Sequence, residues 1–455
     1  MSATTSPGLL DALFTTGRMR AIFSDTQRVQ GMLDFEAALA RAEARAGLMP
    51  EAAAEAIASM CRADALNFDQ IATGAAAAGN LAIPLVKALT RHVAARDEGA
   101  SHFVHWGATS QDAIDTGLVL QMRRAFDVLE SDYASLSATL AALAQSEAHT
   151  LLAGRTWLQQ ALPMSFGVKV AGWLSAVERD RARIAAARER ALVLQFGGAV
   201  GTLASLEDKG LAVAQVLGDL LDLRVPEIPW HSQRDRVVEV ACALGIAVGT
   251  LGKIARDIAL LMQTEVGEAF EPAAPGRGGS SAMPHKRNPV SAAVVISAAL
   301  RVPGLVATML SAMMQEHERG LGGWHAEWDT LPEIFLLAHG ALEQTSHVVR
   351  GLDLDRDRMA ENLAITQGLL SAEAIALALG RTVGKQEAHH LVERACREAI
   401  ATQRHLRAVL STMPEVSERL SAEMLDRLFD PAQASGASLR WIERVLGARA
   451  DGSAH

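Results

Sequence analysis

One segment of the chain combines cationic and hydroxyl side chains with a flexible backbone, a combination suited to binding an anion. Residues 271–289 read EPAAPGRGGSSAMPHKRNP, with four prolines and three glycines in 19 residues. A loop this long without secondary structure is uncommon in a compact protein and is usually functional, often as a lid. Lys286 precedes Asn288-Pro289, which is a typical helix start. A helix N-terminus beside a lysine predicts an anion site, and a mobile loop with solvated charges is the alternative.

Long helices are expected to position this loop, because hydrophobic residues in the middle of the chain follow heptad spacing. The first series is Met122, Phe126, Leu129, Tyr133, Leu136, Leu140 and Leu143. The second is Val237, Ala241, Leu244, Val248, Leu251, Ala255, Ile258 and Met262. The first half of the second series is apolar nearly all round, so burial on every side is expected. Gly245, Gly249 and Gly252 inside it indicate close approach of a neighbouring helix, and the amount of apolar surface suggests an oligomer.

Composition narrows the class of protein. The 455 residues are 49% hydrophobic but only 4% aromatic, which favours a helical fold over an all-β one. A net charge of −9 without a long basic run predicts no nucleic-acid partner. The uncharged run 240–252 is shorter than a membrane span, and the N-terminus lacks the pattern of a signal peptide. Three widely spaced cysteines fit a reducing compartment, so a soluble, cytoplasmic protein is expected.

Three blocks resemble the conserved blocks of the fumarase/aspartase superfamily, in the order of that superfamily. They are WGATSQDAIDT (106–116), GRTWLQQALPMSFGVK (154–169) and GSSAMPHKRNP (279–289). The resemblance implies an all-α, three-domain fold with a central bundle of long helices. The expected boundaries are 1–108, 109–358 with the loop 271–289, and 359–455. It also implies a homotetramer whose active sites combine the three blocks from different subunits.

The resemblance further implies a chemistry and the residues for it. A base removes a proton next to a carboxylate and a group on the adjacent carbon leaves, so catalysis depends on stabilising a dianion. Ser280 matches the position of the base, with Ser281 left open as the alternative. Lys286 and Asn288 match positions that stabilise the dianion. The positions that hydrogen-bond substrate carboxylates are matched by Thr109, Ser110 and Gln159.

Departures from the adenylosuccinate lyase pattern select a branch of the superfamily. Trp157 stands where that lyase has its general-acid histidine, and Ala293 stands where the carboxylate orienting that histidine is expected. The chain is more similar to a cycloisomerase branch, whose members form a lactone from an unsaturated tricarboxylate. A carboxylate leaves without a proton, so the missing histidine is chemically reasonable. Arg319 and Gln233 are then further candidates for binding the substrate, with Trp157 as either a substrate contact or a packing residue.

Two other functions stay open at this point. One is a C–N lyase like adenylosuccinate lyase, and the other is a structural assembly without catalysis, as in crystallins recruited from this superfamily. The residues that match the catalytic positions argue against the structural assembly, because a purely structural role would not require them. No cofactor is expected, and no metal site is expected either, because the 14 histidines have no carboxylate or cysteine partners at ligand spacing.

Overall fold

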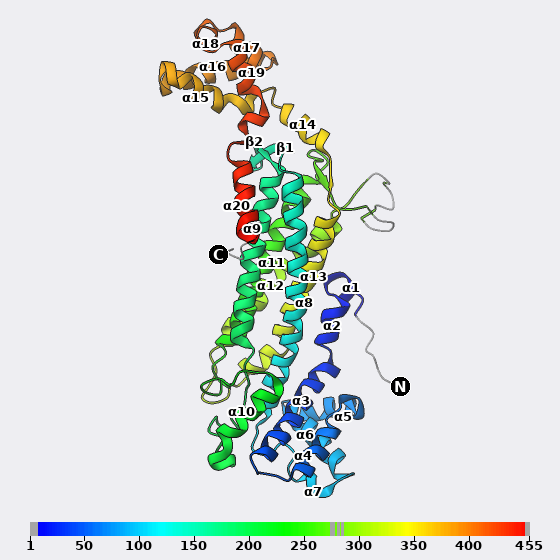
Figure 1. Cartoon of the computed structure of the whole chain (residues 1–455). Helices are drawn as coiled ribbons and strands as arrows, with labels where there is room; N and C mark the ends of the chain where they lie inside the picture. Colours follow the sequence, from blue (N-terminus) through cyan, green and yellow to red (C-terminus); the bar gives the residue numbers. More distant parts are fainter. Residues whose placement is uncertain (1–7, 274–277, 280–282, 284–285, 451–455) are drawn as a thin grey trace. The chain divides into compact units, whose positions relative to one another are not determined.

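The computed structural model describes residues 8–273, 278–279, 283 and 286–450, and these residues are mostly helical (Figure 1). The strands among them form two antiparallel two-stranded sheets. One pairs β1 (Leu151–Thr156) with β2 (Gln159–Ser165), and the other pairs β3 (Ala269–Phe270) with β4 (Asp353–Leu354). The predicted all-α class is therefore confirmed, although no sequence pattern predicted that the second block would form a hairpin.

The chain divides into two compact units, and five long helices contribute residues to both. Unit 1 comprises residues 1–133, 180–252 and 294–343, and unit 2 comprises residues 134–179, 253–293 and 344–455. The five helices are α8 (Ser110–Ser146), α9 (Phe166–Ala191), α11 (Asp235–Leu261), α12 (Val290–Ser311) and α13 (Gly323–Arg350). The division into three domains stays a prediction.

Unit 1 also contains shorter helices, most of them in the N-terminal part of the chain (Figure 1). Among these helices, α3 packs on α4 and on α10, and α5 packs on α6. Its α-helices outside the five are α1 (Asp11–Phe14), α2 (Gly17–Ile22), α3 (Asp25–Arg45), α4 (Glu51–Met60), α5 (Phe68–Ala78), α6 (Ala82–Ala94), α7 (Glu98–Ser101) and α10 (Gly210–Leu221). Short 3-10 turns lie at Ala63–Ala65 and Ala204–Lys209.

Unit 2 contains both two-stranded sheets and the C-terminal helices. Helices α15, α16, α17 and α19 share a hydrophobic core that includes Ile375, Leu391, Leu410 and Leu425. The helices are α14 (Arg356–Ala364), α15 (Ala372–Val383), α16 (Lys385–Thr402), α17 (Leu406–Thr412), α18 (Pro414–Ser417), α19 (Ala422–Phe429) and α20 (Ser438–Ala450). Short 3-10 turns lie at Leu369–Ser371 and Pro431–Ser435.

Both heptad series lie on long helices, as predicted. On α8 the residues from Met122 to Leu140 in the first series are buried, and only Leu143 at its end is half-buried. Every member of the second series is buried, from Val237 on α11 to Met262 directly after its end. Within unit 1, a Cβ added to Gly245 or Gly252 would come within 3.0 Å of Val306 or Ala299 on α12, so close helix approach explains these two glycines. Gly249 meets no atom within 4 Å in the single chain, so no described helix of this chain explains that position.

The prediction that α11 is buried on every side is wrong for the single chain. Ile246 is 51% exposed, and it lies with the half-buried Cys242 on a face that no described helix of unit 1 covers. The neighbouring α12 exposes a further stripe at positions 300, 303, 304, 307 and 310, and Leu300 alone is 75% exposed. Helical periodicity places these positions on one side of α12.

The expectation of no membrane-spanning segment needs correction in one respect. It rested on the uncharged run 240–252, whereas α11 and α12 as whole helices of 27 and 22 residues are long and apolar enough to cross a membrane. That statement concerns length and composition alone.

A buried acid in unit 1 leads to a prediction about stability. Glu43 on α3 is fully buried, and neither carboxylate oxygen has a hydrogen-bond partner among the described residues. Burial first, and the charge of Glu36 second, raise the pKa of Glu43 to about 9. Glu43 therefore stays protonated in the folded protein at neutral pH, whereas in the unfolded chain it ionises above about pH 4.3. Its contribution to stability is present below that pH and is lost as the pH rises toward 9.

We expect Glu43→Gln, which cannot ionise, to be more stable than the parent at pH 8 by about 1–3 kcal/mol. The advantage should vanish near pH 4, and urea unfolding at both pH values measures it. Glu55→Gln is the control, because Glu55 is exposed and paired with Arg41, and it should change stability by less than about 1 kcal/mol. An advantage for Glu43→Gln that does not grow with pH would contradict the prediction.

Candidate active site

In unit 1 the first block includes the N-terminal turns of α8, and Asp112 connects it by hydrogen bonds to the turn at Gly197 and Gly198. The Asp112 carboxylate accepts backbone N–H bonds from Thr109, Gly197 and Gly198 at 2.9–3.0 Å. Nε2 of the buried His231 lies 2.7 Å from the same carboxylate. This arrangement leaves the hydroxyl groups of Thr109 and the adjacent Ser110 half-buried, and neither hydroxyl bonds another described residue.

A buried ion-pair group joins α8, the start of α11 and α13. Arg234 donates to Asp115 at 2.7 Å and 3.2 Å and to Glu327 at 2.6–3.2 Å. Trp324 Nε1 donates to Asp115 at 3.0 Å. Burial raises the pKa of Glu327, and Arg234 only partly offsets this. The group fixes the first turns of α8 relative to α13 within unit 1.

Arg319 lies in the segment between α12 and α13 and is fixed beside the first block. Its Nε donates to Gln111 Oε1 at 3.1 Å, and its Nη2 donates to the carbonyl of Ala199 at 3.1 Å. The segment is also bonded through Ser232 Oγ, which donates to the carbonyl of His317 at 2.6 Å. Gln233 follows directly and its side chain is exposed. In unit 1 these bonds join the segments that carry four residues predicted from the sequence, which are Thr109, Ser110, Gln233 and Arg319.

In unit 2 the second block forms the β1–β2 hairpin, and Trp157 lies at its tip. Trp157 and Leu158 form the two-residue turn with φ of 52° and 64°, a left-handed conformation that favours glycine or asparagine. Trp157 is 97% exposed and Leu158 is 75% exposed. Gln159 next to them is also exposed. An exposed tryptophan in a strained turn is typical of a residue kept for contact with a ligand or another chain.

Charged and amide groups hold this hairpin close behind its tip, at the paired residues Arg155 and Gln160. Arg155 makes two bonds of 2.7 and 2.8 Å to the buried carboxylate of Glu268. Asn362 Nδ2 donates to the same carboxylate at 2.8 Å, and Gln160 Nε2 donates to the backbone carbonyl of Asn362 at 3.0 Å. The hairpin tip is therefore exposed, but the residue pair just behind it is attached to the rest of unit 2.

The third block lies partly outside the described residues. Ser280 and Ser281 are among the residues that the structure does not describe. Lys286 is exposed, and its ammonium group bonds no described residue. Asn288 is half-buried and its backbone N–H donates to the carbonyl of Gly278 at 2.9 Å. Arg287 donates to the carbonyl of Glu271 and pairs with Asp353 at 3.0 Å, so it secures the loop.

The predicted anion site at the start of α12 needs correction. The buried carboxylate of Glu271 accepts the backbone N–H groups of Ser291 and Ala292 at 3.0 and 2.8 Å. These are the donors that a substrate anion would use at a helix N-terminus. Glu271, which the sequence interpretation missed, therefore caps α12 and joins the two ends of the loop. Among the described residues of this block, Lys286 remains available to bind an anion.

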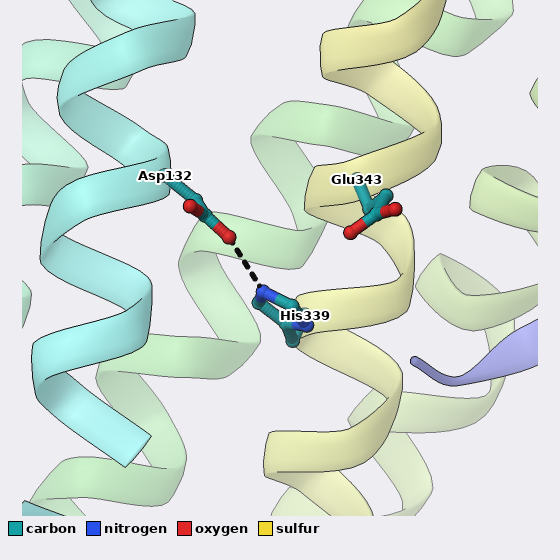
Figure 2. Close-up of side chains that lie close together, drawn as sticks. All are labelled: Asp132, His339 and Glu343. Atoms are coloured by element: carbon teal, nitrogen blue, oxygen red, sulfur yellow. Dashed lines mark hydrogen bonds and ion pairs between the residues drawn. The ribbon is translucent and has the colours of Figure 1, made fainter. Parts of the chain in front are cut away.

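One group of described side chains has metal-ligating atoms close together. Asp132, His339 and Glu343 offer atoms within 4.8 Å of one another, and Asp132 and His339 point toward one another from α8 and α13 (Figure 2). His339 Nε2 lies 2.8 Å from Asp132, and its Nδ1 lies 2.6 Å from Thr16 Oγ1. Arg18 pairs with Asp132 at 2.9 Å. Since both ring nitrogens are bonded and Asp132 is neutralised, we interpret the group as an ion-pair network.

Sequence reasoning missed the residues that hold the site together, above all Gln111, Asp112 and Asp115. Their signal was present in the first block, because QDAID places three polar residues on the first turns of a long helix. The role of these polar groups depends on their burial, and spacing in the sequence does not show which of them is buried.

Comparison with known proteins agrees with this architecture. Residues 14–304 match the lyase family, and residues 368–445 match the adenylosuccinate lyase C-terminus. A 3-carboxy-cis,cis-muconate cycloisomerase of Pseudomonas aeruginosa is 56% identical over 98% of this chain and 97% of its own length. One of Pseudomonas putida is 56% identical over 92% of this chain and 99% of its own length. The crystal structure of the 3-carboxy-cis,cis-muconate lactonizing enzyme from Pseudomonas putida superposes with a TM-score of 0.94, at 53% identity, covering 98% of this chain and 99% of that one. The chain therefore belongs to the lyase family, within the fumarase/aspartase superfamily.

Proposed function

We propose that this enzyme is a cycloisomerase that lactonises 3-carboxy-cis,cis-muconate. The observation that carries the proposal is the 56% identity, over nearly the whole chain, to a relative of that name. The residues at two positions support it independently. Trp157 and Ala293 replace the general-acid histidine and its carboxylate partner that the adenylosuccinate lyase pattern requires. An amine leaving group needs such an acid, whereas a carboxylate does not.

The proposed reaction is an internal addition. One carboxylate oxygen forms a C–O bond to an alkene carbon of the same molecule, and a proton adds to the neighbouring carbon, which lies next to another carboxylate. Electrons and atoms balance without an oxidant, so the reaction requires no redox cofactor. In the reverse direction Ser280 removes that proton, and Lys286 and Asn288 stabilise the dianion that results.

A tricarboxylate needs several cations or hydrogen-bond donors. Lys286 and Arg319 supply the charge in this proposal. Uncharged donors come from Thr109, Ser110, Gln159, Gln233 and, as the alternative serine of the loop, Ser281. Trp157 offers a flat apolar surface for the diene. The net charge of −9 does not oppose this, because a few placed donors decide the local potential.

Turnover tests the proposal directly. We expect the purified enzyme to consume 3-carboxy-cis,cis-muconate, seen as loss of its diene absorbance, and to leave adenylosuccinate unchanged. The similarity of residues 368–445 to the adenylosuccinate lyase C-terminus makes a C–N lyase the second candidate. Cleavage of adenylosuccinate without consumption of the muconate would select that candidate. Absence of both activities would favour the crystallin-like structural assembly.

We also propose a homotetramer with active sites shared between subunits, located in the cytoplasm. The exposed apolar stripe of α12 and the exposed Ile246 of α11 support it, because surfaces of this kind are usually covered by another chain. The exposed Trp157 fits a residue that completes the site of another subunit. All three cysteines are free, which fits a reducing compartment.

Sedimentation equilibrium should give a mass near four times the 48.3 kDa of one chain. Leu300→Glu places a charge on the exposed stripe and should lower that mass, whereas Leu377→Glu, on the exposed face of α15, should not. A parent protein that sediments as a single chain would refute the assembly.

A further inference from the structure

A single buried amide connects the ion-pair group of unit 1 to Arg319. Gln111, the second residue of α8, is fully buried. Its Nε2 donates to Asp115 Oδ2 at 3.1 Å and to the carbonyl of His231 at 2.9 Å. Both partners can only accept, so the NH2 group must face them. The oxygen of the amide is thereby turned toward Arg319, from which it accepts a bond of 3.1 Å.

The guanidinium of Arg319 is bound along one side only. Nε is bonded to Gln111 and Nη2 to the carbonyl of Ala199. Nη1 has no hydrogen-bond partner in the part of the chain that the structure describes. Arg319 is half-buried in a segment that contains no helix or strand. Without its two bonds it would lose a fixed geometry, since a free arginine side chain samples many rotamers.

Only an amide fits between these groups. The position must accept a bond from a guanidinium and donate two bonds to acceptors, one of them a carboxylate. A carboxylate at position 111 could not donate and would face Asp115 with the same charge, and a cation could not accept. Asp115 is itself bound by Arg234 and Trp324, so Gln111 is attached to a rigid part of unit 1.

We propose that Gln111 is a positioning residue for the reaction. It holds the guanidinium of Arg319 so that the Nη1 side presents two N–H groups to one carboxylate of the substrate. A planar guanidinium binds a carboxylate through two parallel bonds only when its plane is correctly oriented. The inference rests on the proposed function, because it takes Arg319 as a substrate-binding residue.

The first experiment compares steady-state kinetics on 3-carboxy-cis,cis-muconate. Gln111→Met removes the acceptor and keeps the length of the side chain. We expect KM to rise about tenfold and kcat to change much less, because Arg319 binds the carboxylate both before and during the reaction. Gln195→Met is the matched control. Gln195 is equally buried and lies 3.4 Å from the same Asp115 oxygen, but it does not contact Arg319. It should lower Tm to a similar extent and leave KM within about threefold.

Arg319→Ala completes a double-mutant cycle. In that background Gln111→Met should have almost no further effect on KM. If Arg319→Ala raises KM but Gln111→Met does not, or if Gln195→Met raises KM equally, the positioning role is overturned. If Arg319→Ala itself leaves KM unchanged, the assignment of Arg319 in the proposed function fails instead.

Arg319→Lys keeps the inference testable even if Gln111→Met does not fold. Lysine retains the charge in a half-buried segment but cannot bind Gln111 and Ala199 while presenting a planar pair of donors. We expect KM to rise nearly as far as in Arg319→Ala. A KM within about threefold of the parent would show that charge alone suffices and that orientation by Gln111 is not needed.

Discussion

Ser280→Ala is expected to reduce kcat on 3-carboxy-cis,cis-muconate by about 10²–10⁴-fold, the usual contribution of a positioned acid or base. A serine is a weak base at its ordinary pKa, so its role depends on the cations and donors around it. Alanine removes the hydroxyl and leaves Lys286 and Asn288 in place. Binding should therefore be retained, and KM should change little.

Ser281→Ala is the matched control for Ser280→Ala, because it makes the same change one residue further along the loop. It should retain most of the activity. If Ser281→Ala loses activity and Ser280→Ala does not, the base is the second serine. Near-normal activity in both variants would remove the hydroxyl groups of this loop from the mechanism. The sedimentation mass of each variant must equal that of the parent enzyme.

Arg234→Met is expected to cause the largest loss of stability, about 3–5 kcal/mol. The substitution leaves two buried carboxylates, Asp115 and Glu327, facing one another without a cation. Repulsion and the cost of burying unpaired charge then act together. Urea unfolding at pH 7 measures the loss, and activity should fall with it, because Asp115 also orients Gln111.

Arg190→Met provides the comparison for Arg234→Met. Arg190 pairs with Glu239 within unit 1, but both side chains are substantially exposed, at 53% and 39%. Water screens such a pair, so its loss should lower the stability far less than Arg234→Met does. Equal effects of the two substitutions would mean that the buried group contributes no more than a surface pair.

The sequence led to predictions for the residues of the site but not for the residues that support them. In unit 1, bonds of Gln111 and Ser232 join the segments that carry Thr109, Ser110, Gln233 and Arg319. The residues that hold the site together were not predicted, because a sequence does not distinguish a buried amide from an exposed one. The predicted anion site at the start of α12 was wrong for a related reason. Glu271 lies 20 residues before Ser291, and no local pattern connects a carboxylate to donors so far along the chain.

What the sequence determined by itself is the class of fold and the chemistry. Heptad spacing is a local property that reports the buried face of a helix directly, and both series are buried as predicted. The three blocks carried the resemblance because they are continuous stretches of chain.

Only the tertiary structure decided which groups are buried, which donors are already used, and which faces remain uncovered. It showed that the second block is a hairpin with Trp157 exposed at its tip, and that α11 leaves Ile246 uncovered in the single chain. It also showed that the buried amide of Gln111 accepts a bond from Arg319. These properties depend on contacts between residues far apart in the sequence, and the free energy of a polar group depends on those contacts and not on its neighbours along the chain.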